Sequence, residues 1–159
     1  MKKLYALLTL LLLATSLSFA QSSKEIYRKY SDNPDFEAVY ISPAMLRLVG
    51  RIPDLATEEI DLGRLIKSMT GGFFVLSTSN AKSGQALADD VKKLLDKGNY
   101  ELLMEAKEKG EATRIYSEGN DKRVTSIVLL SKETDETSFI CIDGNIDRKE
   151  LEDILAEAM

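Results

Sequence analysis

The stretch ATRIYSEGNDKRVTSIVLLSKETDETSFICID, residues 112–143, decides the fold because it holds three strand-like runs separated by short polar turns. The runs cover residues 112–117, 123–131 and 137–143 and are rich in β-branched and aromatic side chains, which favour strands. The connections are too short for crossover helices, so successive runs must pair antiparallel. We therefore predict a three-stranded antiparallel meander at this point in the chain.

Two of these runs are apolar on both faces. IVLL at residues 127–130 and FICI at residues 139–142 place hydrophobic side chains on both sides of a strand, whereas a sheet covered on one side alternates apolar and polar residues. Either helices cover the second face, or part of it is left for a partner or a second copy of the chain. We expect helices to cover it, because single chains rarely expose large apolar patches.

Two further strands and several helices are expected around the meander. Residues 38–41 form the first strand, and FFVL at residues 73–76 is expected in the middle of the sheet because it is apolar on both sides. Caps, prolines, glycines and apolar spacing predict the helices. Their expected starts are Ser23, Ser42-Pro43, Asp61, Ser83, Asn99 and Asp147, and the first five end at residues 31–34, Pro53, Gly71, Gly98 and Gly110.

The expected fold class is α+β, with a mainly antiparallel sheet of about five strands that ends in the three-stranded meander and packs against several short helices. We expect residues 21–159 to form a single domain, because a chain of this length buries about two thirds of its unfolded surface and needs no metal or disulfide to complete a core. No repeat or low-complexity tract divides it.

The first twenty residues, MKKLYALLTLLLLATSLSFA, have the pattern of a secretory signal peptide. Two lysines precede an apolar run, and SFA supplies the small residues required for cleavage after Ala20. A transmembrane anchor needs about 20 apolar residues, and polar side chains interrupt this run early. Bacterial lipid attachment needs a cysteine after the cut, where this chain has Gln21. We predict a periplasmic or secreted protein that is not a lipoprotein and does not insert in the membrane after cleavage.

Charge and cysteine content exclude several classes of function. Loss of the two signal lysines changes the formal net charge from −5 to −7, which makes nucleic acid a poor partner. Cys141 is the single cysteine, so no internal disulfide forms, and its strand position favours burial as a small hydrophobic residue. The chain has no histidine, which removes the usual general base and the commonest ligand of transition metals. We predict no catalytic, cofactor-binding or metal-binding residue.

Asp143, Asn145 and Asp147 have the spacing that begins an EF-hand calcium loop, but the rest of that motif is missing. Its sixth position should be glycine and is Arg148, and its twelfth should be glutamate and is Ile154. A strand end, a turn and a helix cap explain the three residues without calcium.

Two other polar stretches are interpreted in the same way. The acidic residues at 32–37 are interrupted by Pro34 and are typical of a solvated turn. The polar stretch STSN at residues 77–80 would form the lip of a pocket if the chain had one, although such a stretch is more often a simple loop.

Three segments resemble small exported proteins of Bacteroidetes that share a domain of unknown function, DUF4252. They are YISPAMLRL at residues 40–48, KGNYELLMEAKEKGEATRIY at residues 97–116 and DGNIDRKELEDI at residues 143–154. The resemblance implies an α+β domain of the cell envelope and a link to loci of extracytoplasmic-function sigma factors. It transfers no catalytic residue. Some members look like lipoproteins, which Gln21 argues against for this chain.

We therefore expect a non-catalytic envelope protein that acts by binding, through a protein partner or self-association, as an accessory of surface signalling or of a stress response. One alternative is a small hydrolase that uses a pair of carboxylates. Another is a carrier of an apolar ligand, which requires a closed cavity lined by leucines.

Overall fold

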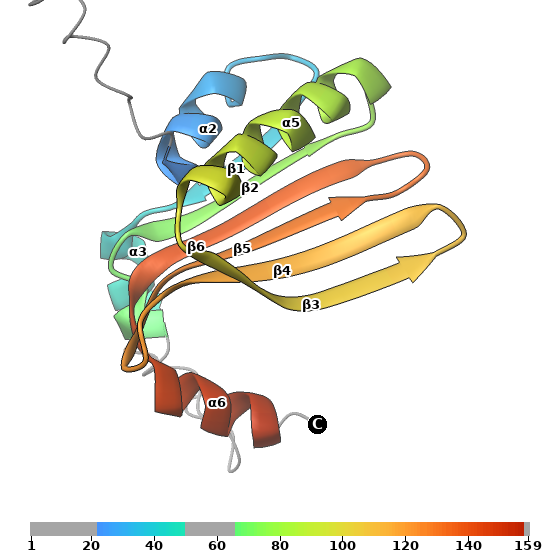
Figure 1. Ribbon diagram of the computed structural model, residues 1–159. Coiled ribbons are helices and arrows are strands. Elements are labelled where there is room, and N and C mark those ends of the chain that lie inside the picture. Colours follow the sequence, from blue (N-terminus) through green and yellow to red (C-terminus); the bar gives the residue numbers. More distant parts are fainter. Residues whose placement is uncertain (1–21, 50–65, 158–159) are drawn as a thin grey trace, which may run out of the picture.

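A computed structural model describes residues 22–49 and 66–157 and shows an α+β fold built on one six-stranded antiparallel sheet (Figure 1). The strand order is β1-β2-β6-β5-β4-β3. The strands are β1 (Glu37–Ile41), β2 (Gly72–Thr78), β3 (Tyr100–Glu108), β4 (Glu111–Gly119), β5 (Arg123–Lys132) and β6 (Thr137–Asp147). The helices are α2 (Ser23–Tyr30), α3 (Pro43–Val49), α5 (Ala81–Lys97) and α6 (Arg148–Glu157). The predicted signal peptide and residues 61–65 of the helix predicted from Asp61 lie outside the described residues, and residues 66–68 of that helix are helical.

The predicted meander is confirmed and is longer than expected, because β3 joins it as a fourth consecutive strand. The helix predicted from Asn99 to Gly110 is wrong. Lys109 and Gly110 both have positive φ angles, 49° and 91°, which suit a tight hairpin turn. Strand β3, whose residues favour a helix in isolation, instead pairs with β4 from Tyr100 to Glu108, with one irregularity between Leu102 and Met104.

The FFVL segment lies in β2, which is an interior strand but not the middle of the sheet, since the order places it second from an edge. As in any β-strand, its side chains alternate between the two faces of the sheet, so FFVL places apolar side chains on both faces. Phe74 and Leu76 are buried on the side of α5, whereas Phe73 and Val75 are half-buried on the opposite side. We call these sides the first face and the second face of the sheet.

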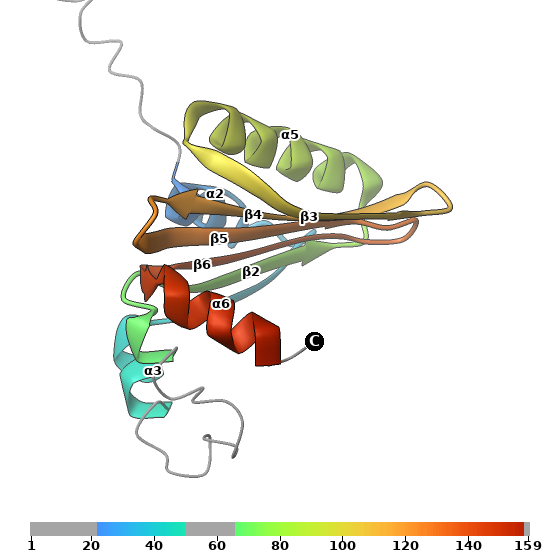
Figure 2. The same cartoon turned by 60° about the horizontal axis from the view of Figure 1, so that its bottom comes forward.

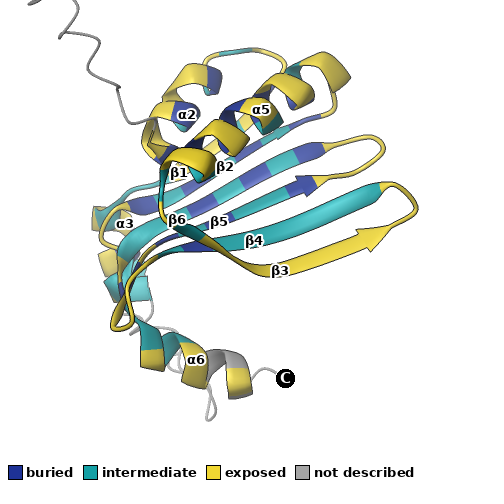
Figure 3. Ribbon diagram, viewed as in Figure 1, coloured by how far each residue is buried: buried dark blue, intermediate teal, exposed yellow. Residues whose placement is uncertain are grey.

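Helices α2 and α5 cover the first face over β2, β6 and part of β5 (Figures 1 and 3). Local sequence sets where both helices begin. Ser22 and Glu25 form a capping box before α2, one residue earlier than the predicted cap, and the Asn80 side chain accepts hydrogen bonds from two backbone amides of α5. The core beneath them consists of Ile26, Tyr30, Phe36, Phe74, Leu76, Leu87, Val91, Leu94, Val128, Phe139 and Cys141.

A buried carboxylate joins the two covering helices. Asp90 of α5 is 4% exposed and accepts hydrogen bonds from Tyr30 Oη at 2.7 Å, from Lys93 Nζ at 3.0 Å and from Lys29 Nζ. Burial opposes ionisation of Asp90, but the hydrogen bonds from these three donors outweigh it and lower the pKa of the carboxyl group. Burial and the bond to Asp90 raise the pKa of Tyr30, so its hydroxyl stays protonated and donates.

The second face carries an apolar row that crosses all six strands. The register aligns Val39, Val75, Ile140, Leu129, Ile115 and Met104. Helices α3 and α6 lie on this side of the sheet (Figure 2). The four central residues of the row are nonetheless only half-buried, and the terminal residues Val39 and Met104 are 50% and 46% exposed. The described helices therefore cover this face less completely than we expected.

No helix in the described part of the chain is long and apolar enough to cross a membrane.

Candidate functional site

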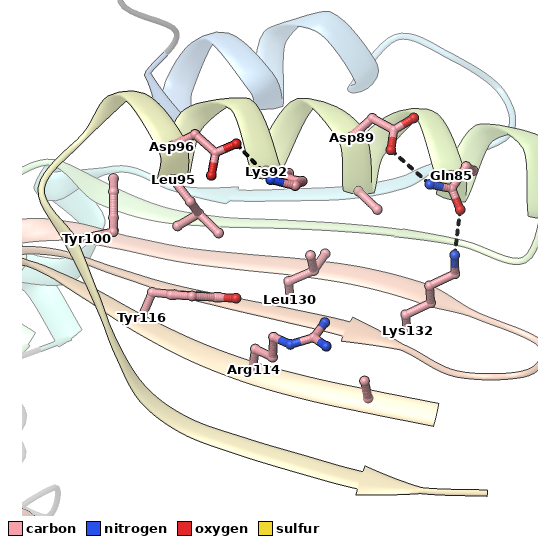
Figure 4. Close-up of a pocket in the computed structure, with 12 residues that line it drawn as sticks. Gln85, Asp89, Lys92, Leu95, Asp96, Tyr100, Arg114, Tyr116, Leu130 and Lys132 are labelled. Atoms are coloured by element: carbon pink, nitrogen blue, oxygen red, sulfur yellow. Dashed lines mark hydrogen bonds and ion pairs between the residues drawn. The ribbon is translucent and has the colours of Figure 1, made fainter. Parts of the chain in front are cut away.

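A cleft of about 490 Å³ lies between α5 and the first face of β4 and β5 (Figure 4). It exists because α5 crosses β2, β6 and β5 but leaves the part of the sheet beyond them without a covering helix (Figure 1). Its walls are formed by Gln85, Ala88, Asp89, Lys92, Leu95 and Asp96 of α5, Tyr100 of β3, Ala112, Arg114 and Tyr116 of β4, and Leu130 and Lys132 of β5.

One half of the cleft is apolar. Leu95 projects from α5 toward Tyr116 and Leu130 on the strands, and Tyr100 closes this end (Figure 4). All four side chains are half-buried, so they expose apolar surface to the cleft while packing against the core. The Tyr100 hydroxyl reaches Ser126 Oγ at 3.3 Å, and burial raises the pKa of Tyr100 to about 12, which keeps this hydroxyl protonated at neutral pH.

The other half of the cleft is polar and carries Arg114 and Lys132 on neighbouring strands. Both side chains rise from the sheet into the space below α5 (Figure 4). Lys132 Nζ donates to Gln85 Oε1 at 2.5 Å, and Gln85 Nε2 donates to Asp89 Oδ1 at 2.9 Å. Gln85 therefore separates a cation on the strand side from an acid on the helix side.

Arg114 is held by one acidic neighbour outside the cleft. Its Nε donates to Glu105 Oε2 at 2.5 Å, and Lys107 Nζ lies 2.8 Å from the other oxygen of the same carboxylate. These two cations lower the pKa of Glu105. On the helix side, Lys92 and Asp96 pair with each other at 2.8 Å. One carboxylate thus serves two cations on the strands, and the strand side of the cleft is basic.

The edge strand β3 borders the cleft and is the most exposed element of the sheet (Figure 3). Every residue of β3 except Tyr100 is exposed, including the consecutive residues Leu102, Leu103 and Met104. The register with β4 shifts between Leu102 and Met104, which marks a β-bulge at Leu103. Among the described strands, β3 has β4 as its only neighbour, so its outer backbone groups face away from the sheet.

The model of a family described as Domain of unknown function (DUF4252) matches residues 30–154. The chain belongs to this family. The match includes every strand of the sheet and both walls of the cleft. No curated protein and no solved structure matches the chain significantly.

Cys141 lies in the core of this DUF4252 domain, as predicted from its strand position. Its Sγ donates to Asp143 Oδ1 at 3.2 Å, and Ser126 Oγ donates to the same oxygen at 2.8 Å. Burial and the charge of Asp143 raise the pKa of the Cys141 thiol well above its usual range. A thiol that stays protonated is a poor nucleophile, so the cysteine is a packing residue.

The residues with EF-hand spacing have separate structural roles. Asp143 accepts the hydrogen bonds from Ser126 and Cys141, and Asp147 Oδ1 accepts from the backbone N–H of Glu150 at 3.2 Å in the first turn of α6. The latter contact confirms the predicted helix cap. In residues 22–49 and 66–157, no group of three or more His, Cys, Asp or Glu residues is placed to hold a metal ion.

The polar stretch at residues 77–80 lines a pocket of about 320 Å³ together with the acidic turn at residues 34–37. Its side chains are already engaged in local structure. Thr78 donates to the Asp35 carbonyl at 2.6 Å, and Asn80 caps α5. These contacts connect the turn to the start of α5, so the simple-loop interpretation describes the stretch better than a binding lip.

The residues that line the cleft were not predicted from the sequence. Arg114 and Tyr116 lie on either side of Ile115 in β4, which identifies them as one face of a strand but does not show what lies opposite. The assignment of residues 99–110 to a helix also concealed the edge strand. Only the strand register brings Arg114 and Lys132 together beneath α5.

Proposed function

We propose that this DUF4252 domain is a non-catalytic exported protein of the cell envelope that acts by binding another protein through strand β3. The observation that carries the proposal is the run of three exposed apolar residues, Leu102, Leu103 and Met104, at the centre of a nine-residue edge strand. Charged residues flank the run on both sides. Leu102 pairs with Tyr116 of the first face and Met104 with Ile115 of the second face, so the edge exposes apolar side chains on both sides of the sheet. Exposed apolar side chains bordered by charged residues are typical of protein-binding surfaces.

An edge strand offers two kinds of interaction to a partner. Its outer N–H and C=O groups can extend the sheet by one strand, and its exposed side chains can enter pockets of the partner. Covering Leu102, Leu103 and Met104, which are 49%, 46% and 46% exposed, stabilises a complex by roughly 1 kcal/mol for each side chain. The bulge at Leu103 and the charges at Glu101 and Glu105 oppose unselective pairing with other edges, so a partner must match this surface.

The absence of histidine, the burial of Cys141 and the contacts of the acids in the cleft support the proposal that the protein is not catalytic. The chain contains no histidine, and the Cys141 thiol is buried and protonated. The acids of the cleft, Asp89 and Asp96, accept hydrogen bonds from Gln85 and Lys92 instead of facing each other across an open space. The contacts of Asp89 and Asp96 therefore do not favour a hydrolase that uses a pair of carboxylates in this cleft.

Export and a role in surface signalling or stress response rest on the N-terminal sequence and on the family. Residues 1–20 have the pattern of a cleaved signal peptide. The resemblance of residues 40–48, 97–116 and 143–154 to exported proteins is the second ground for proposing an envelope protein. Cleavage after Ala20 would leave the capping box at Ser22 and Glu25 intact, so α2 is compatible with the processed chain. We place the partner in the periplasm or on the cell surface.

Site-specific photo-crosslinking in intact producing cells tests this proposal. A photoreactive residue at position 103 should yield one predominant protein adduct, and the same adduct should disappear when Leu102 and Met104 are changed to glutamate. A photoreactive residue at position 48 is the control, because Leu48 is also exposed but lies on α3. Equal adducts from both positions, or no adduct from position 103, would contradict the proposal.

A further inference from the structure

We propose that the cleft below α5 binds a small amphipathic carboxylate, with its apolar chain against Tyr116 and Leu130 and its carboxylate between Arg114 and Lys132. This site differs from the protein-binding surface on β3 and does not depend on the function proposed for that surface. The cleft volume of about 490 Å³ is within the range of about 300–1,000 Å³ that is typical of small-molecule sites.

The apolar half of the cleft determines where the chain of the ligand lies. Leu95, Tyr116 and Leu130 come from three different elements and face one another across the cleft (Figure 4). Each is half-buried and packs against the core, so a ligand meets a pre-formed surface and need not order it. Tyr100 closes this end, which directs the polar group of the ligand toward the opposite end.

The strand register places the two cations of the opposite end in one layer. Arg114 pairs with Leu130, and Ala112 pairs with Lys132, so Arg114 and Lys132 are diagonal neighbours on the first face. Diagonal neighbours in a sheet are about 7–8 Å apart, a separation that long side chains span. A carboxylate has two oxygens and can therefore accept from both residues at once.

Both cations have capacity for such a ligand. Lys132 contacts the neutral amide of Gln85, which is a weaker acceptor than a carboxylate because charge-assisted hydrogen bonds are roughly twice as strong as neutral ones. Arg114 contacts Glu105 through Nε, which uses one of the five N–H donors of a guanidinium group. A bound carboxylate would thus replace an amide at Lys132 and add to an existing pair at Arg114.

The remaining charges orient the ligand. Asp89 on the helix side would repel a carboxylate, so the anion must approach the strand side. Lys92 and Asp96 neutralise each other. The whole chain carries a formal net charge of −5, which disfavours unspecific association with anions. Affinity for a carboxylate must therefore come from Arg114 and Lys132.

Isothermal titration calorimetry of the mature domain at pH 7 with decanoate, 1-decanol and acetate tests the proposal. Decanoate should bind at least about tenfold more tightly than either of the others, because only decanoate combines the chain with the charge. The Lys132→Gln variant should weaken decanoate binding by about tenfold, and the Arg114→Gln variant by a similar factor. Lys122→Gln, a change of an exposed lysine outside the cleft, is the matched control and should bind as the unmodified domain does.

Backbone amide NMR spectra during the titration locate the ligand. Decanoate should shift the signals of Ala88 and Leu130, which line the cleft, and leave Val75 and Ile140 on the second face unchanged. Equal affinity for decanoate and 1-decanol, unchanged binding by the Lys132→Gln variant, or shifts confined to the second face would overturn the proposal. If Arg114→Gln disturbs folding through its contact with Glu105, the Lys132→Gln variant still decides the result.

Discussion

Replacing Asp90 with asparagine tests the contact that holds α2 against α5. The Asp90 carboxylate is buried and receives hydrogen bonds from Tyr30, Lys29 and Lys93. Asparagine has nearly the same size but carries no charge and has one acceptor oxygen in place of two. The substitution therefore weakens these bonds without leaving a cavity.

The expected loss in the free energy of unfolding depends on how exposed each hydrogen-bond donor to Asp90 is. Tyr30 is buried, and a hydrogen bond to a charged group contributes about 1.5–3 kcal/mol. The side chains of Lys29 and Lys93 are 56% and 62% exposed, so solvent screening limits each of their pairs to about 0–1 kcal/mol. We expect the free energy of unfolding to fall by about 2–4 kcal/mol in the Asp90→Asn variant.

The same contact predicts how stability depends on pH. The pKa of Asp90 in the folded protein lies below its ordinary value of 3.8. Its stabilisation is therefore complete above that ordinary value and is lost as the pH falls through the lower pKa of the folded state. In the Asp90→Asn variant this part of the acid sensitivity should be absent.

Urea denaturation followed by circular dichroism, at pH 7 and at several values down to pH 3, measures both effects. Asp96→Asn is the matched control, because Asp96 lies on the same helix but forms an exposed pair with Lys92 and should cost less than about 0.5 kcal/mol. A loss below about 0.5 kcal/mol for Asp90→Asn, or acid sensitivity equal to that of the unmodified domain, would refute the assignment of Asp90 as the contact between the helices.

Two further predictions concern the core. Because burial raises the pKa of Cys141, iodoacetamide should label it at pH 8 at least about 100-fold more slowly in the folded domain than in urea, and similar rates by mass spectrometry would contradict its burial. Gly84→Ala should lower the free energy of unfolding by about 1–3 kcal/mol, since a Cβ there would lie 2.5 Å from Thr137 Oγ1 and force α5 away from β6. An additional Thr137→Ala change should recover part of that loss in urea denaturation, and a stabilised Gly84→Ala variant would show that the helix packs less closely.

Most helices and strands that are marked by turn residues, caps or apolar spacing could be predicted from the sequence. The meander, the strand at residues 38–41, the helix after Pro43 and the long helix α5 all lie where turns, caps and apolar spacing indicated. Burial of Cys141 followed from its place among apolar neighbours in a strand. These features depend on residues that are close in sequence, so the sequence alone is sufficient to locate them.

The edge strand shows where local signals fail. Residues 100–108, YELLMEAKE, are good helix formers with apolar side chains at helical spacing, and for that reason we predicted a helix. In the folded chain, hydrogen bonding to β4 across the Lys109–Gly110 turn outweighs a helix preference of a few tenths of a kcal/mol for each residue. The same error hid the exposed edge that carries Leu102, Leu103 and Met104.

The sequence by itself determined the α+β class, the hairpins of the predicted three-stranded meander, the helix caps at Ser42 and Asp147 and the exclusion of histidine chemistry, because each of these is a property of neighbouring residues or of composition. Only the tertiary structure decided which strand lies at the edge of the sheet and which side chains meet below α5. Strand register and helix position depend on contacts between distant parts of the chain, and a shift of one residue would move Arg114 and Tyr116 to the opposite face. The cleft and the edge strand, on which both proposals rest, are therefore products of long-range pairing.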